Sequence, residues 1–239
     1  MSHAAPQTDT RLIVPLDLPT ADDARAMVAA IGDAVSFYKV GLELLASDGM
    51  TLAHELKARG KSVFLDWKLH DIGETVRRAA AALGRSNCDL LTVHAEPQVM
   101  AAAVQGRGTD SPLKILAVTV LTSLTDADLI EMGSAFGARD LVERRIGQAL
   151  AAGVDGVVSS PQEASLARDL ARAAGRPDFL VVTPGVRPFW AAKNDQARAA
   201  TPGAAIAAGA THIVCGRPIT AANDPREAAL KVIAEMAEG

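Results

Sequence analysis

Aromatic residues are scarce in this chain of 239 residues, making up only 3% of the total. Hydrophobic residues nevertheless make up 49%, so aliphatic side chains and alanine must fill any core. Such a core suits strands packed beneath helices. The length fits either one α/β barrel or two small domains.

Cysteine, long apolar runs and excess positive charge are also lacking. The two cysteines, Cys88 and Cys215, lie far apart without C-x-x-C spacing, which argues against a disulfide framework or a thiolate metal site. No apolar run approaches the roughly 18 residues of a membrane span, and the polar start of the chain has no signal core, so we expect a cytoplasmic protein. A net charge of −4 argues against binding to nucleic acid or an acidic membrane, but it allows a small anionic ligand in a local basic pocket.

Short apolar runs alternate with alanine-rich stretches of helical periodicity along the chain. We expect strands at 12–16, 37–40, 62–65, 90–93, 115–121, 156–159, 179–183 and 212–215. We expect the main helices at 21–31, 44–59, 74–83, 98–104, 139–152, 162–174, 202–208 and 225–237. This order predicts a single (β/α)8 TIM barrel over residues 11–239 after a flexible segment, 1–10, because an open doubly wound sheet usually stops at about five or six strands.

Polar residues gather where the predicted strands end, which is the rim that holds the active site in TIM barrels. The clearest group is Asp66 and Lys68, whose side chains we expect on the same side of the third strand because side chains alternate with period two. With Asp17 and Lys39, at the ends of the first two strands, they could form an alternating array of cations and anions. The alternative is a structural network of buried ion pairs.

A second group follows the seventh and eighth strands, where barrels commonly bind phosphate. It comprises the segments Thr183-Pro184-Gly185-Val186-Arg187 and Gly216-Arg217-Pro218. Arginine offers forked, charge-assisted donors to phosphate oxygens, and glycine lets backbone N–H groups approach an anion. The long connection at 186–200, which contains Gln196, is interpreted as a lid, the alternative being an ordinary surface loop.

The segment Asp66-x-Lys68-x-His70-Asp71-Ile72 resembles the signature of the orotidine 5′-phosphate decarboxylase family. The similarity extends along almost the whole chain. It includes Val14-Pro15-Leu16-Asp17, Tyr38-Lys39-Val40-Gly41, Thr119-Val120-Leu121-Thr122-Ser123, Thr183-Pro184-Gly185-Val186-Arg187 and Gly216-Arg217-Pro218-Ile219.

The resemblance implies decarboxylation of orotidine 5′-monophosphate (OMP) to UMP, the final step of de novo pyrimidine nucleotide synthesis, with no cofactor and no metal. Lys68 would protonate the ring carbon, with Asp66 beside the departing carboxylate. Lys39 and Asp17 would hold ribose hydroxyls and orient the charged array. The resemblance also implies a homodimer in which Asp71, a further catalytic residue, reaches the partner's site together with Ile72 and Thr75. The remaining substrate-binding residues would be Thr122 and Ser123 near the base, and Pro184, Arg187, Gln196, Gly216 and Arg217, the last four of them at the phosphate.

One segment departs from the family pattern. The family usually continues Asp-Ile-Pro-Asn-Thr, whereas this chain reads Asp71-Ile72-Gly73-Glu74-Thr75. Gly73 loosens a turn that proline would restrict, and Glu74 suits the first turn of a helix. We expect the change to affect the details of the dimer contact rather than the chemistry.

Two alternatives remain open. A magnesium-dependent sugar-phosphate decarboxylase or synthase can be built on the same Asp-x-Lys-x-x-Asp pattern. A non-catalytic protein that binds a phosphorylated nucleotide is the other. The pair Thr122-Ser123 together with the Gln196 loop favours the pyrimidine enzyme.

Overall fold

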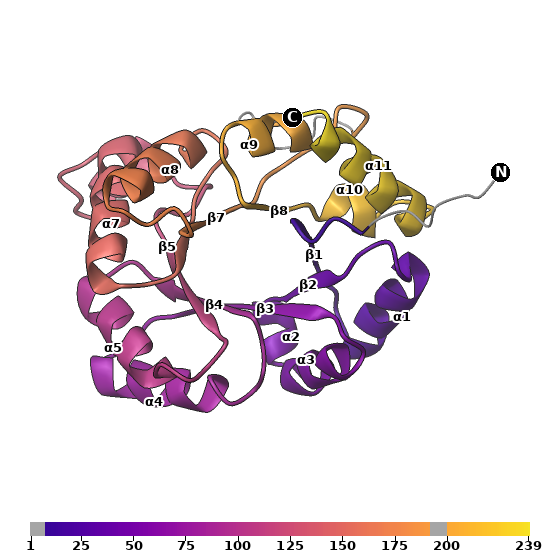
Figure 1. Cartoon of the computed structure of the whole chain (residues 1–239), viewed down its shortest axis with the longest axis horizontal. Helices are drawn as coiled ribbons and strands as arrows, with labels where there is room; N and C mark the ends of the chain where they lie inside the picture. The colour runs from indigo at the N-terminus through magenta and orange to yellow at the C-terminus, as the bar shows by residue number, and fades with distance from the viewer. Residues whose placement is uncertain (1–7, 192–199) are drawn as a thin grey trace.

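The computed structural model describes residues 8–191 and 200–239, and its strands close into a barrel (Figure 1). Neighbouring strands are consecutive in sequence and parallel, and β8 pairs with β1 to complete the ring. The strands are β1 (Leu12–Pro15), β2 (Phe37–Val40), β3 (Ser62–Leu69), β4 (Leu90–His94), β5 (Lys114–Val118), β6 (Gly156–Val158), β7 (Leu180–Thr183) and β8 (His212–Val214). The predicted single (β/α)8 barrel is confirmed. Residues 1–7 of the segment predicted to be flexible lie outside the described residues.

Helices surround the barrel as an outer layer (Figure 1). They are α1 (Ala21–Ile31), α2 (Leu42–Leu45), α3 (Gly49–Ala58), α4 (Gly73–Leu83), α5 (Pro97–Arg107), α6 (Asp126–Glu131), α7 (Ala138–Ala152), α8 (Ala164–Ala173), α9 (Pro202–Ala207), α10 (Arg217–Thr220) and α11 (Pro225–Ala237). None of the helices within the described ranges is long and apolar enough to cross a membrane.

Three helical features differ from the sequence prediction. The single helix expected at 44–59 is two helices, because Asp48 adopts a left-handed conformation with φ of 63° between them. Helix α6 was not predicted, although Thr125 and Asp128 form a capping box at its start. Helix α10 is a single short turn that begins at Arg217.

Alternation along the strands divides the core into two clusters. One face of the strands packs against the helices and forms the larger cluster. The other face fills the barrel with a small apolar cluster made of Ile13, Phe37, Phe64, Leu90, Leu116, Val182 and Val214. Burying each of these side chains contributes about 1.5–3 kcal/mol, so the floor of the barrel is well supported.

The polar site lies two residues further along the same strands, toward their carboxyl ends. Lys39 follows Phe37 by two residues, Asp66 follows Phe64 by two, and Thr92 follows Leu90 by two. Because side chains repeat their direction every second residue, these polar groups enter the barrel directly above its apolar floor.

Strand β3 is longer and less regular than predicted. Leu65 pairs with Leu91 and Leu69 with Val93, so three residues of β3 face the single residue Thr92 of β4. Lys68, the last of the three, has a φ of 48°, which is uncommon for a residue with a side chain. The simple alternation used to predict the direction of Lys68 therefore does not describe the backbone there.

Candidate active site

Four charged side chains form a continuous chain of contacts at the barrel mouth. The Nζ of Lys39 lies 2.8 Å from Asp17 Oδ1 and 3.4 Å from Asp66 Oδ2. The Nζ of Lys68 donates to Asp66 Oδ1 at 2.7 Å. The structure thus brings together the four residues from which the sequence predicted an alternating array.

Burial of this group strengthens its electrostatic contacts and so affects the protonation state of Asp66. The side chains of Lys39 and Asp66 are only 10% and 15% exposed, whereas Asp17 is half-exposed at the edge of the group. Burial alone would raise the pKa of Asp66, but the charges of Lys39 and Lys68, with hydrogen bonds from Lys68 and Thr92, outweigh it and leave the pKa below its usual value. Asp66 is therefore a carboxylate at neutral pH.

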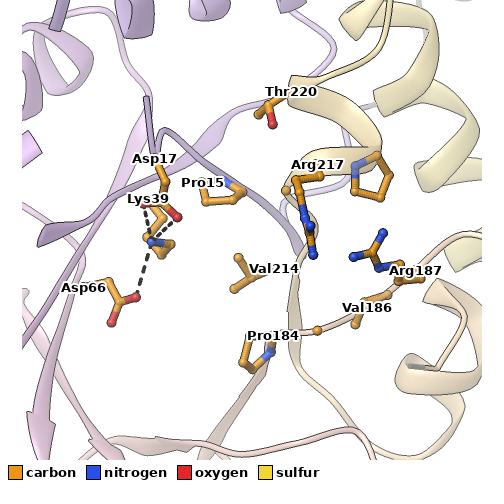
Figure 2. A pocket seen from close by; sticks show the side chains of 13 residues that line it. Pro15, Asp17, Lys39, Asp66, Pro184, Val186, Arg187, Val214, Arg217 and Thr220 are labelled. Carbon is orange, nitrogen blue, oxygen red and sulfur yellow. Dashed lines mark hydrogen bonds and ion pairs between the residues drawn. The ribbon is translucent and has the colours of Figure 1, made fainter. Parts of the chain in front are cut away.

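A cavity of about 350 Å³ connects Asp17, Lys39 and Asp66 of this array to the two predicted phosphate-binding arginines, whereas Lys68 lies behind Asp66 and is not part of the cavity wall. Figure 2 shows Asp17, Lys39 and Asp66 on one side of it and Arg187 and Arg217 on the other. Its walls are formed by Pro15, Asp17, Lys39, Asp66, Pro184, Gly185, Val186, Arg187, Val214, Gly216, Arg217, Pro218 and Thr220. The cavity is therefore suited to a ligand with an anionic group at one end and hydrogen-bonding groups at the other.

A second cavity, of about 510 Å³, adjoins the first and shares Pro184 and Gly185 with it. Thr122 and Ser123 line this second cavity and are both exposed. The two residues predicted near the base thus lie next to the first cavity rather than in its wall.

Asp71, Ile72 and Thr75 lie outside both cavities and are exposed on the surface of the chain. The side chain of Ile72 is large and apolar, yet the residue is 70% exposed. Glu74 occupies the first turn of α4, as predicted, and pairs there with Arg77 at 2.7 Å. Gln196 lies outside the described residues.

Two residues beside the array had been given no role from the sequence. Thr92 is fully buried, and its Oγ1 both donates to Asp66 Oδ1 at 2.9 Å and accepts the backbone N–H of Lys68 at 3.0 Å. The sequence did offer a signal for Thr92, because it is the one polar residue in the otherwise apolar strand predicted at 90–93. Gly41 is the other, since a Cβ on it would lie 2.3 Å from Asp17 Oδ1.

A rim of imidazole and carboxylate groups borders the array on the β3–β4 side. The rings of His70 and His94 lie 4.9 Å apart, and Glu96 lies 3.7 Å from His70 Nε2 and 3.4 Å from Arg145. Burial lowers the pKa of His94, and the charges of His70, Arg145 and Lys68 lower it further against the opposing effect of Glu96. His94 is therefore a neutral imidazole at pH 7.

A family model and individual relatives of known name both match this chain over most of its length. Residues 10–232 match the model of the orotidine 5'-phosphate decarboxylase / HUMPS family. The orotidine 5'-phosphate decarboxylase of Caulobacter vibrioides is 79% identical over 229 residues, which cover 96% of this chain and 98% of that one. The protein of the same name from Rhodopseudomonas palustris (strain BisB5) is 53% identical over 238 residues, covering 100% of this chain and 99% of the relative.

A solved structure shares the fold. The crystal structure of orotidine 5'-phosphate decarboxylase from Lactobacillus acidophilus superposes with a TM-score of 0.81 at 36% identity, covering 95% of this chain and 99% of that one. A family match over most of the length, together with relatives at this identity, settles the assignment. The chain belongs to the orotidine 5'-phosphate decarboxylase / HUMPS family.

Proposed function

We propose that this protein decarboxylates OMP to UMP without a cofactor, as the last step of pyrimidine nucleotide synthesis in the cytoplasm. The observation that carries the proposal is that one cavity has the Asp17–Lys39–Asp66 contacts at one end and Arg187 and Arg217 at the other. The names of the close relatives support the same activity.

The proposed orientation of the substrate follows from the charges. The phosphate lies against the two arginines and the backbone at Gly216, whose forked and N–H donors match its oxygens. The ribose hydroxyls lie at Asp17 and Lys39, and the ring carboxylate lies beside Asp66. Thr122 and Ser123 approach the base from the second cavity, and we propose that Gln196 contributes to the phosphate site.

The chemical step then requires only groups of the protein. The bond between the ring carbon and the carboxylate carbon breaks, carbon dioxide leaves, and the electron pair remains on the ring carbon. The ammonium of Lys68 stabilises that developing charge and transfers a proton to it, which forms UMP and leaves a neutral amine that solvent reprotonates.

Magnitudes decide which electrostatic effect dominates. Repulsion between the Asp66 carboxylate and a substrate carboxylate about 4 Å away is roughly 4 kcal/mol at an effective dielectric constant near 20. Enzymes typically lower barriers by about 8–23 kcal/mol. Ground-state repulsion is therefore too small by itself, and we assign the larger share to stabilisation of the transition state by Lys68. Binding of the remote phosphate contributes by ordering the site.

We also propose a homodimer in which Asp71, Ile72 and Thr75 complete the partner's site. The support is their exposure, because a catalytic carboxylate that faces outward needs a second surface to act on. Ile72 is 70% exposed, and Leu42 and Leu45 on α2 are 54% and 46% exposed, so this part of the barrel rim also presents apolar side chains that a partner would cover.

The magnesium-dependent alternative is disfavoured by a contact within the array. The Nζ of Lys39 lies between Asp17 and Asp66, at 2.8 and 3.4 Å, so a lysine side chain already occupies the position beside the two carboxylates that could otherwise serve as metal ligands. The binding-protein alternative differs in its outcome, since such a protein would bind UMP but release no carbon dioxide from OMP.

The test is the loss of OMP absorbance on addition of purified protein in EDTA, with UMP identified as the product. Lys68→Ala is the matched control. We expect it to remain folded while turnover falls by about 10²–10⁴-fold or more, because this range is the usual contribution of a general acid. Activity abolished by EDTA would favour the metal-dependent alternative. Substantial UMP formation by folded Lys68→Ala would overturn the assignment of the proton donor.

A further inference from the structure

The irregular part of β3 leaves Thr92 in an unusual position. Between the pairs Leu65–Leu91 and Leu69–Val93, three residues of β3 face this single residue of β4. The middle residue, Trp67, packs into the outer core, while Asp66 and Lys68 meet on the other side of the strand. Ladder hydrogen bonds between the strands are interrupted there, so another group must satisfy the buried backbone.

The Thr92 hydroxyl does this in two directions at once. It accepts the backbone N–H of Lys68 at 3.0 Å, and it donates its proton to Asp66 Oδ1 at 2.9 Å. The same carboxylate oxygen accepts from Lys68 Nζ at 2.7 Å. Thr92, Asp66 and Lys68 therefore form a closed ring of hydrogen bonds that joins the backbone of the lysine to its own side-chain partner.

Two features indicate that this ring of hydrogen bonds holds Lys68 in place, in addition to pairing buried polar groups. Thr92 is 0% exposed, so water does not compete for its hydroxyl. Lys68 has a φ of 48°, a conformation that persists only where the surroundings hold it. Its N–H bond to Thr92 is the side-chain contact that holds the backbone in this conformation.

We propose that Thr92 is a positioning residue for the decarboxylation, acting through Lys68 and Asp66 rather than by touching the substrate. This inference rests on the proposed function. By fixing the backbone of Lys68 and the rotation of the Asp66 carboxylate, the hydroxyl sets the direction in which the ammonium faces the reacting carbon. Catalytic groups displaced by about 1 Å can lose on the order of 10²-fold in rate, so such support matters to turnover.

The test compares a variant of Thr92 that loses the hydroxyl with one that keeps it. Thr92→Val is nearly isosteric but removes both hydrogen bonds, and Thr92→Ser keeps the hydroxyl. For Thr92→Val we expect kcat on OMP to fall about 10- to 100-fold while KM stays within about 2-fold, the size expected for losing a hydrogen bond to a charged group. Thr92→Ser should retain kcat within about 3-fold of the wild type.

Thr211→Val is the matched control. The half-buried Thr211 hydroxyl also bonds the backbone, accepting from Val181 N at 2.9 Å and donating to Val181 O at 3.0 Å, and it lies 3.1 Å from His212 Nδ1, but it is at the opposite end of the barrel. Thr211→Val should lower the melting temperature and leave kcat unchanged. If Thr92→Val does not fold, Thr92→Ala and Thr92→Ser form an equivalent pair that differs only in the hydroxyl.

The outcomes separate this inference from the proposed function. Absence of OMP turnover by the wild type would refute the function, and a crystal structure of Thr92→Val would still test the positioning. Retention there of the positive φ of Lys68 and of its contact with Asp66 would overturn the inference. With an active wild type, equal kcat for Thr92→Val and the wild type, or equal losses in the Val and Ser variants, would also overturn it.

Discussion

Gly41 is predicted to be required for the space it leaves rather than for its backbone freedom. Its φ of −90° and ψ of −173° are accessible to any residue. A Cβ placed there, however, would lie 2.3 Å from Asp17 Oδ1 and 3.0 Å from Lys39 Nζ. In Gly41→Ala the carboxylate must therefore retreat by at least 0.7 Å to reach the 3.0 Å limit for such contacts (3.0 − 2.3).

The expected loss of activity in Gly41→Ala follows from the hydrogen bond that is broken when the Asp17 carboxylate moves. Lys39 Nζ reaches Asp17 Oδ1 at 2.8 Å and Oδ2 at 3.1 Å, and a shift of this size on the crowded side removes the shorter bond. Hydrogen bonds to charged groups contribute about 1.5–3 kcal/mol, and the half-exposed Asp17 places this one at the low end. A loss of about 1.5 kcal/mol corresponds to roughly a 10-fold fall in kcat/KM for OMP.

The assay is the decrease of OMP absorbance under steady-state conditions, combined with a double-mutant cycle. Gly147→Ala is the matched control, because a Cβ on this glycine of α7 meets nothing within 4 Å. It should leave kcat/KM unchanged and add roughly 0.5–1 kcal/mol of stability. In an Asp17→Ala background, Gly41→Ala should cause no further loss, since the group it displaces is absent.

Two results would refute this reasoning. One is an unchanged kcat/KM in Gly41→Ala, which would mean that the methyl group is accommodated without moving Asp17. The other is a full 10-fold loss in the Asp17→Ala background, which would show that the substitution acts through the fold and not through the carboxylate.

Three further predictions concern other parts of the molecule. Arg217→Ala should raise KM for OMP about 10- to 100-fold with a smaller effect on kcat, as expected for a lost charge-assisted bond to phosphate, and an unchanged KM would count against that role. Burial first, and then the charges of Lys114 and Arg11, lower the pKa of His212 from 6.5 to about 4, with Asp9 opposing them. His212 must therefore stay neutral in the folded state, so its contribution of up to about 3 kcal/mol is complete above pH 6.5 and is lost as the pH falls toward 4; urea unfolding across this range should show a slope that is weaker in His212→Asn. Mixing Asp71→Ala with Lys68→Ala protein should restore up to about a quarter of the wild-type rate if subunits exchange at random, because each mixed dimer then has one intact site, whereas no recovery would place Asp71 within its own subunit's site.

The sequence by itself determined the architecture and the main charged groups. Apolar runs alternating with amphipathic stretches specify strands and helices locally, and eight such units leave a closed parallel barrel as the arrangement that buries both faces of every strand. Since the carboxyl ends of parallel strands meet at one rim, the positions of Asp17, Lys39, Asp66 and Arg217 in the sequence were enough to predict that they gather there.

Only the tertiary structure decided how those groups are held. Thr92 contacts Asp66 from 26 residues away, and it does so because β3 and β4 are out of step by two residues, which depends on the packing of both strands. The need for glycine at position 41 likewise arises from the approach of Asp17, in the segment that follows β1. The conformation of Lys68 has the same origin, because its cost in local backbone energy is offset by the hydrogen bond to Thr92 on the neighbouring strand.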